Sequence, residues 1–181
     1  MHHSITYKVE KGFTLLETLV AISVLLIIII GPMTIAQKGV QNAFFANEQL
    51  TAIFLAQEAT EAVRELRDAE ALDVYTGGID TETSDWIPAG CSTECAYDVV
   101  NNVFEACSEG CVLKIDSNGN YNYEPGGTLS PFTRKISVGS VVDGGAPVTV
   151  DVSWSAKILG GVTKHVILQT WVYDHYQRFE N

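Results

Sequence analysis

The feature that most constrains this chain is a nearly continuous apolar run directly after Gly12. The run, FTLLETLVAISVLLIIII, has 18 residues and a single charge, at Glu17. An apolar stretch of about 20 residues is long enough for a helix to cross a bilayer, and residues 31–36 add length for a tilted helix. The sequence therefore predicts a transmembrane helix over residues 13–36, preceded by a polar segment, residues 1–12.

The distribution of charge indicates which side of the membrane the rest of the chain occupies. Lys8 and Lys11 precede the apolar run, whereas only Lys38 follows it closely. Basic residues favour the cytoplasmic side, so we expect an exported C-terminal part. The net charge of −11, from 22 acidic and 11 basic residues, argues against a nucleic-acid partner, because such proteins neutralise phosphates with basic side chains.

A helical pattern continues beyond the span. Apolar residues recur every three or four positions, which predicts an amphipathic helix over residues 37–76: Leu50, Ile53, Ala56, Ala59, Val63 and Leu66. Glu61 with Arg64, and Arg64 with Asp68, have spacings that let side chains meet on a helix. We expect one helix from residue 13 to about residue 72. Pro32, next to Gly31, lacks an amide hydrogen and predicts a kink there.

The remaining sequence predicts a long loop and then a sheet. Residues 77–111 are rich in Gly, Ser, Thr, Asp and Cys and predict an irregular loop. Residues 112–181 predict strands at 112–116, 121–124, 132–142, 148–155 and 163–173. In VTVDVSWS, Val148, Val150, Val152 and Trp154 alternate with polar residues, and Gly160-Gly161 predicts a hairpin to the last strand. The fold class is α+β, with a long helix on an antiparallel meander sheet.

The four cysteines lie within the predicted loop. Cys91 with Cys95 and Cys107 with Cys111 repeat a CxxxC spacing. Four thiolates can bind a structural zinc ion, although the usual spacing is shorter. In an exported domain disulfides are favoured, and three pairings are open.

Two other groups of residues are candidate sites. Asp116, Asn118 and Asn120 resemble the start of a calcium loop, but the twelfth position is Gly127 rather than an acid, and an Asn-Gly hairpin turn is the simpler interpretation. No nucleophile and base pattern indicates an enzyme, and no cofactor is expected. His165 is interpreted as a strand surface residue. The tryptophans, Trp86, Trp154 and Trp171, are interpreted as packing or surface anchors. The other histidines, His2, His3 and His175, lie near the ends of the chain.

The segment KGFTLLETLVAISVLL resembles the signal of the prepilin family. The resemblance implies that a prepilin peptidase cuts after Gly12, that the new terminal residue Phe13 is N-methylated, and that Glu17 pairs with a neighbouring subunit's terminal amine. An acid inside a bilayer costs roughly 2.5 to 3.5 kcal/mol on insertion scales, which agrees with a partner for Glu17.

Other interpretations of this segment stay open. Thr14 and Glu17 also fit a capping box, which is compatible with the prepilin interpretation. An ordinary secretory signal would be cut after Thr34-Ile35-Ala36 and leave Gln37 first, but the apolar run is longer than the usual h-region of about 7 to 15 residues.

The resemblance extends over most of the chain. FLAQEATEAVRELRD, CSTEC, LKIDSNGNYNY, PFTRKISV and the VTVDVSW to LQTWVYD hairpin look like the minor-pilin or pseudopilin branch. A 12-residue leader, and Pro32 as the 20th mature residue, depart from the usual pattern and leave the subclass open.

The resemblance implies a structural subunit of a type IV pilus or a type II secretion pseudopilus. Its partners would be other pilin subunits, the peptidase, an inner-membrane assembly platform and, before assembly, membrane lipid. It would start as a single-pass inner-membrane precursor with an exported C-terminus and end in a cell-surface or periplasm-spanning filament. The alternative is a single-span membrane protein whose exported loop, residues 77–110, is a binding module.

Overall fold

The computed structural model describes residues 12, 14–76, 86–88, 90–107, 109–156 and 160–173. The chain divides into two compact units, residues 1–44 and residues 45–181, and each is considered by itself. Expectations for residues 1–11 of the 12-residue leader, for Phe13 and for His175 lie outside the described residues.

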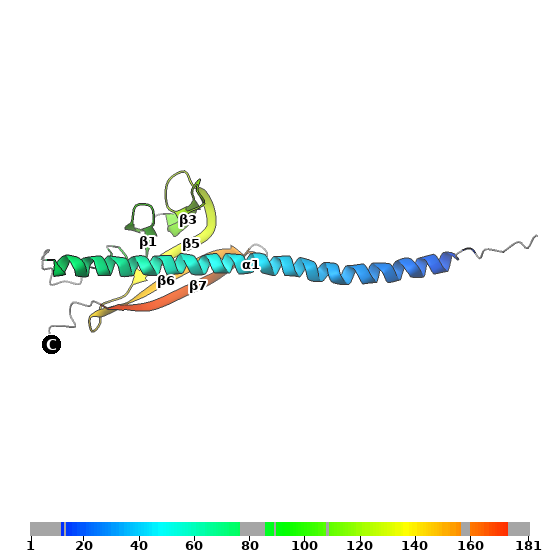
Figure 1. The fold of residues 1–181 in the computed structure, drawn as a ribbon, viewed down its shortest axis with the longest axis horizontal. Coiled ribbons are helices and arrows are strands. Elements are labelled where there is room, and N and C mark those ends of the chain that lie inside the picture. Colours follow the sequence, from blue (N-terminus) through cyan, green and yellow to red (C-terminus); the bar gives the residue numbers. More distant parts are fainter. Residues whose placement is uncertain are drawn as a thin grey trace, which may run out of the picture. The chain divides into compact units, whose positions relative to one another are not determined.

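The long helix α1 spans Leu15–Tyr75 (Figure 1). Thr14 is its N-cap, because the Thr14 carbonyl accepts from the amides of Glu17 and Thr18 at 3.0 and 3.2 Å. The expected helix is confirmed, with its C-terminal end three residues beyond residue 72. Helical structure continues through Gly31 and Pro32, so the kink there stays a prediction.

The second unit contains one seven-stranded sheet, and every strand pair in it is antiparallel. Its strands, with one 3-10 turn, are β1 (Cys95–Asp98), β2 (Val103–Ala106), η1 (Glu109–Cys111), β3 (Val112–Ile115), β4 (Tyr121–Asn122), β5 (Thr128–Val138), β6 (Gly145–Ala156) and β7 (Val162–Tyr173). The α+β class and the final hairpin are therefore confirmed, and β6 pairs with β7 along its full length, from Gly145 with Tyr173 to Ala156 with Val162.

Strand β5 organises the sheet. Ile136 pairs with Cys95 of β1 on one side and with Val150 of β6 on the other, and Thr133 pairs with β3 on the same side as β1. Thus β1 and β3 follow one another along a single edge of β5. The meander that the sequence predicted is limited to β5, β6 and β7.

The core lies between the sheet and the part of α1 that belongs to the second unit (Figure 1). Val148, Val150, Val152 and Trp154 of β6 are all buried, as the alternation predicted. They pack in one cluster with an alanine-rich helix face: Ala52, Leu55, Ala56, Ala59, Ala62 and Val63. Small side chains let the helix backbone approach the sheet closely, and this arrangement is type IV pilin-like.

Three expectations were wrong in detail. Residues 77–111 are not all loop, because their described part contains β1 and β2. These four-residue strands pair with each other, and β1 joins the sheet where Cys95 pairs with Ile136 of β5. The strand expected at 132–142 is β5, Thr128–Val138, which ends where Gly139 lies against Pro147. Leu50 was assigned to the buried helix face, but it is 54% exposed.

Candidate processing and assembly segment

The first turn of α1 combines a cap with an exposed acid. The Glu17 amide donates to the Thr14 hydroxyl at 3.3 Å, which is the threonine half of the expected capping box. The Glu17 side chain is exposed, and no ion pair among the described residues includes it. A carboxylate is favourable at a helix N-terminus because the helix dipole is positive there. Glu17 therefore stabilises the helix start and still has a carboxylate free to bind another group.

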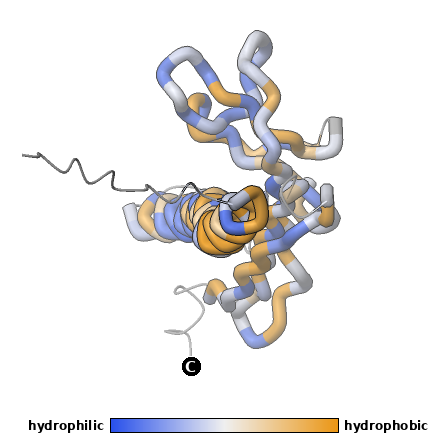
Figure 2. Tube along the Cα trace, turned by 90° about the vertical axis from the view of Figure 1, so that its right-hand side faces the viewer, coloured by the Kyte–Doolittle hydropathy of each residue, from blue (hydrophilic) through white to orange (hydrophobic). Residues whose placement is uncertain are grey.

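The helix of the first unit is apolar on all sides. Large apolar side chains are exposed at nearly every position of residues 15–30, and the turns that face the viewer in Figure 2 are almost entirely coloured hydrophobic. An apolar surface around the whole circumference requires lipid or other helices as its surroundings. By length and composition this helix is able to cross a membrane.

The polar hydroxyls of this segment bond within the helix itself. The hydroxyls of Thr18, Ser23 and Thr34 donate to the carbonyls of Leu15, Leu19 and Gly31 at 2.9, 2.8 and 2.7 Å. Because these hydroxyls have hydrogen-bond partners within the helix, placing the helix in an apolar environment costs less free energy. Glu17 is then the one acidic side chain in residues 12–36 that needs a partner there.

A comparison with protein families identifies this segment. The family model described as the prokaryotic N-terminal methylation motif matches residues 7–31. The chain carries a prepilin-type N-terminal signal. The match includes Gly12, Phe13 and Glu17, and together with the apolar helix it indicates a membrane-anchored, pilin-like precursor, that is, a structural subunit. No curated protein and no solved structure matches the chain.

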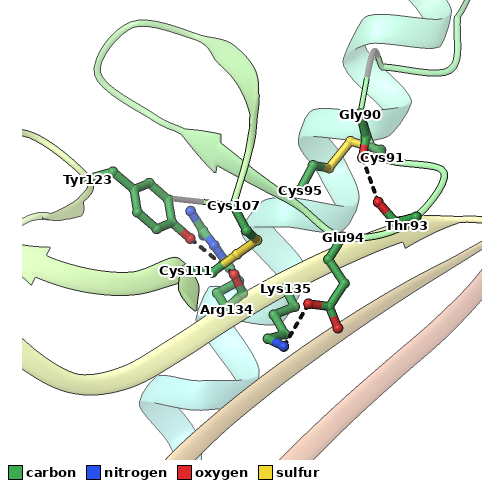
Figure 3. The surroundings of a disulfide bond; sticks show 10 residues. All are labelled: Gly90, Cys91, Thr93, Glu94, Cys95, Cys107, Cys111, Tyr123, Arg134 and Lys135. Atoms are coloured by element: carbon green, nitrogen blue, oxygen red, sulfur yellow. Dashed lines mark hydrogen bonds and ion pairs between the residues drawn. A yellow bond between two sulfur atoms is a disulfide. The ribbon is translucent and has the colours of Figure 1, made fainter. Parts of the chain in front are cut away.

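The four cysteines form two local disulfides in the second unit (Figure 3). Cys91 is bonded to Cys95 and Cys107 to Cys111, with Cα atoms 4.7 and 5.0 Å apart. The sequence left three pairings open, and in the structure each cysteine pairs with the other cysteine of its own CxxxC segment, with no free cysteine among the described residues. The two bonds flank the β1–β2 hairpin, one directly before it and one directly after.

Sequence reasoning missed the buried Arg134 on β5. Its guanidinium donates to the carbonyl oxygens of Leu55 at 3.2 Å and Tyr97 at 2.7 Å, and it forms an ion pair with Glu58. The ring of Tyr123 lies against it, with the centroid 5.9 Å from the guanidinium carbon (Figure 3). The alternation of β5 could have indicated that Arg134 is buried, because Phe132, Arg134 and Ile136 share one face of the strand. Arg134 links the helix to two parts of the sheet.

The turn between β3 and β4 accounts for the residues that resembled a calcium loop. One oxygen of Asp116 accepts from the amides of Asn118 and Asn120 at 2.8 and 2.9 Å. The other accepts from the Asn120 side chain at 3.2 Å, and Ile115 pairs with Tyr121. The backbone amide of Asn120 is the main cause that lowers the pKa of Asp116. The carboxylate closes a hairpin turn, as the simpler interpretation held.

The tryptophans and His165 have structural positions. Trp86 and Trp154 are buried, and the Trp154 indole donates to Glu48 at 3.1 Å. Trp171 is exposed on β7. His165 is an exposed strand residue, as expected, with Nδ1 3.0 Å from Asp151.

The expected helix-surface ion pairs are half right. Glu61 and Arg64 are paired at 2.6 Å, but Asp68 binds Arg67, at 2.7 Å, instead of Arg64. Arg64 lies near the sheet, where its guanidinium donates to the Thr170 hydroxyl at 3.4 Å. A side chain already directed toward β7 is not placed to meet Asp68.

Proposed function

We propose that the chain is the precursor of a filament subunit of a type IV pilus or a type II secretion pseudopilus, of the minor-pilin or pseudopilin branch. A prepilin peptidase cuts after Gly12, Phe13 is N-methylated, and an inner-membrane platform assembles the mature chain. The observation that carries this proposal is the methylation motif at residues 7–31, which includes the start of a helix with apolar side chains exposed on every side.

The same helix surface serves before and after assembly. In the membrane the side chains of residues 15–30 contact lipid, and in the filament they contact the helices of other subunits. Helix association in an apolar environment depends on packing rather than on transfer from water. Replacing lipid contacts by contacts with other helices therefore changes the free energy only a little. The sheet domain is carried to the exported side, where its disulfides persist.

Glu17 sets the alignment of subunits in this proposal. Its carboxylate pairs with the terminal amine of Phe13 in a neighbouring subunit. A carboxylate left unpaired in an apolar core is costly, so the subunits stop at the position where the pair forms. A Glu17→Ala chain is expected to be processed but to give little filament, and normal assembly of that chain would remove the alignment role.

Mass spectrometry of the chain produced together with a prepilin peptidase tests the processing step. The expected product begins at Phe13, carries one N-methyl group and lacks the four hydrogens of two disulfides. Gly12→Val should retain the leader. Gly39→Ala is the matched control, because an added methyl there meets no atom within 4 Å, and it should be processed normally.

Two other products would contradict the proposal. A chain that keeps its leader in the presence of the peptidase would favour a single-span membrane protein with an exported binding module. A product that begins at Gln37 would indicate an ordinary secretory signal. Electron microscopy of material sheared from cells then tests assembly itself.

A further inference from the structure

The part of α1 in the second unit has an exposed face that carries large apolar side chains next to an acid. Leu50 and Phe54 are 54% and 66% exposed. A helix turns about 100° per residue, so both lie on the side opposite the sheet-packed Ala52 and Ala59. Glu61 lies two turns further along this same side and is also exposed. The face, Leu50–Phe54–Glu61, thus presents two large apolar side chains followed by an acid.

The first unit carries the complementary side chains at the same spacings. Ile27, Gly31 and Lys38 are separated by four and seven residues, as are Leu50, Phe54 and Glu61. All three positions are exposed, and an added methyl at Gly31 would meet no atom within 4 Å. Gly31 leaves a notch for a large side chain, and Lys38 is the one basic residue between Gly12 and Arg64.

We propose that the Leu50–Phe54–Glu61 face of one copy binds the Ile27–Gly31–Lys38 segment of a second copy, with the two helices parallel. The inference rests on the proposed function, since it assumes that copies of the chain assemble. The displacement is 23 residues, or about 35 Å along the helix. Phe54 inserts at Gly31, Leu50 packs on Ile27, and Lys38 pairs with Glu61.

Other displacements that oppose Lys38 to an acid fit less well. Pairing Lys38 with Glu65 puts Ile27 opposite Phe54 and Gly31 opposite Glu58, so no large apolar side chain fills the notch at Gly31. Glu58 is already bound to the buried Arg134. The displacement of 23 residues also sets Thr34 opposite Gln57, a polar pair.

The charges around Glu61 permit the contact. Arg64 holds one Glu61 oxygen at 2.6 Å in an exposed pair, which leaves the second oxygen for Lys38. An exposed pair within one helix contributes little, so it does not compete strongly. Glu65, one turn further on the same side, adds attraction for Lys38.

Cysteine cross-linking in assembled filaments tests the register. A disulfide requires Cα atoms within about 7 Å, so a chain with both Lys38→Cys and Glu61→Cys should give an intermolecular ladder under mild oxidation. The matched control combines Lys38→Cys with Asp68→Cys, which lies two turns further along, and it should give no ladder. A ladder from the control, or none from the first chain in intact filaments, would overturn the register.

Charge exchange provides a test without cysteines. Lys38→Glu and Glu61→Lys should each reduce filament yield several-fold, and the chain with both changes should recover it. Single variants that assemble normally, or a double variant that is no better than either, would contradict the pairing. Wild-type chain that is processed but forms no filament would refute the proposed function, whereas wild-type filaments that lack the cross-link would refute this register alone.

Discussion

Arg134 offers the sharpest test of how the helix is held on the sheet. Arg134→Ala removes a guanidinium that is fully buried and donates to the carbonyl oxygens of Leu55 and Tyr97. It also leaves Glu58 without its ion-pair partner. The adjacent Lys135 is the matched control, because its side chain points to the other face of β5 and forms an exposed pair with Glu94.

The expected loss follows from these bonds. A hydrogen bond from a charged donor contributes about 1.5 to 3 kcal/mol, and the loss of two such bonds together with the vacated volume gives about 3 to 5 kcal/mol. Glu58 adds little, because it is 38% exposed and can be solvated. Lys135→Ala should cost no more than about 1 kcal/mol. Arg134→Met, which keeps most of the volume, should lie between the two.

Urea unfolding of the full chain in detergent, followed by tryptophan fluorescence, to which the buried Trp86 and Trp154 contribute, measures these differences. The free energy of unfolding should fall in the order Lys135→Ala, Arg134→Met, Arg134→Ala. Equal losses for Arg134→Ala and Lys135→Ala would show that the buried guanidinium does not anchor α1, and the reasoning from its hydrogen bonds would be refuted.

Two further predictions concern the sheet domain. The lowered pKa of Asp116 means that the folded turn favours the carboxylate. The carboxylate therefore stabilises the turn fully at pH values above its ordinary pKa of 3.8, and this stabilisation is lost as the pH falls through the lowered pKa. A pKa of Asp116 at or above 3.8 in an NMR titration would contradict this. Limiting reductant should open Cys107–Cys111 before Cys91–Cys95, because Cys107 is only half-buried whereas the other three cysteines are buried. Alkylation and mass spectrometry follow the order, and simultaneous opening would count against it; each five-residue loop contributes about 2 kcal/mol when closed.

Much of the fold could be predicted because it depends on local pattern. The apolar run after Gly12 requires a helix, since a helix satisfies its own backbone groups in an apolar environment. The alternation from Val148 to Trp154 defines a strand with one buried face, and Gly160-Gly161 turns it back into β7. Asp116 and Asn120 close a turn through contacts only four residues apart.

The remaining features depend on residues that are distant in sequence. Strand β1 joins the sheet through the pair of Cys95 with Ile136 of β5, and Arg134 is buried because Leu55, Glu58 and Tyr97 surround it. Period alone assigned Leu50 to the buried face, whereas the position of the sheet places it in solvent.

The sequence by itself determined the membrane-length helix, the prepilin-type signal and the final hairpin, because each is encoded within about 30 consecutive residues. Only the tertiary structure decided which side of α1 meets the sheet, and hence which side remains free for another copy. That choice is made by packing between residues of α1 and β6 that are about a hundred positions apart in the chain, such as Ala52 and Val150. The local pattern placed Ala56, Ala59 and Val63 correctly, but it could not separate them from the exposed Leu50.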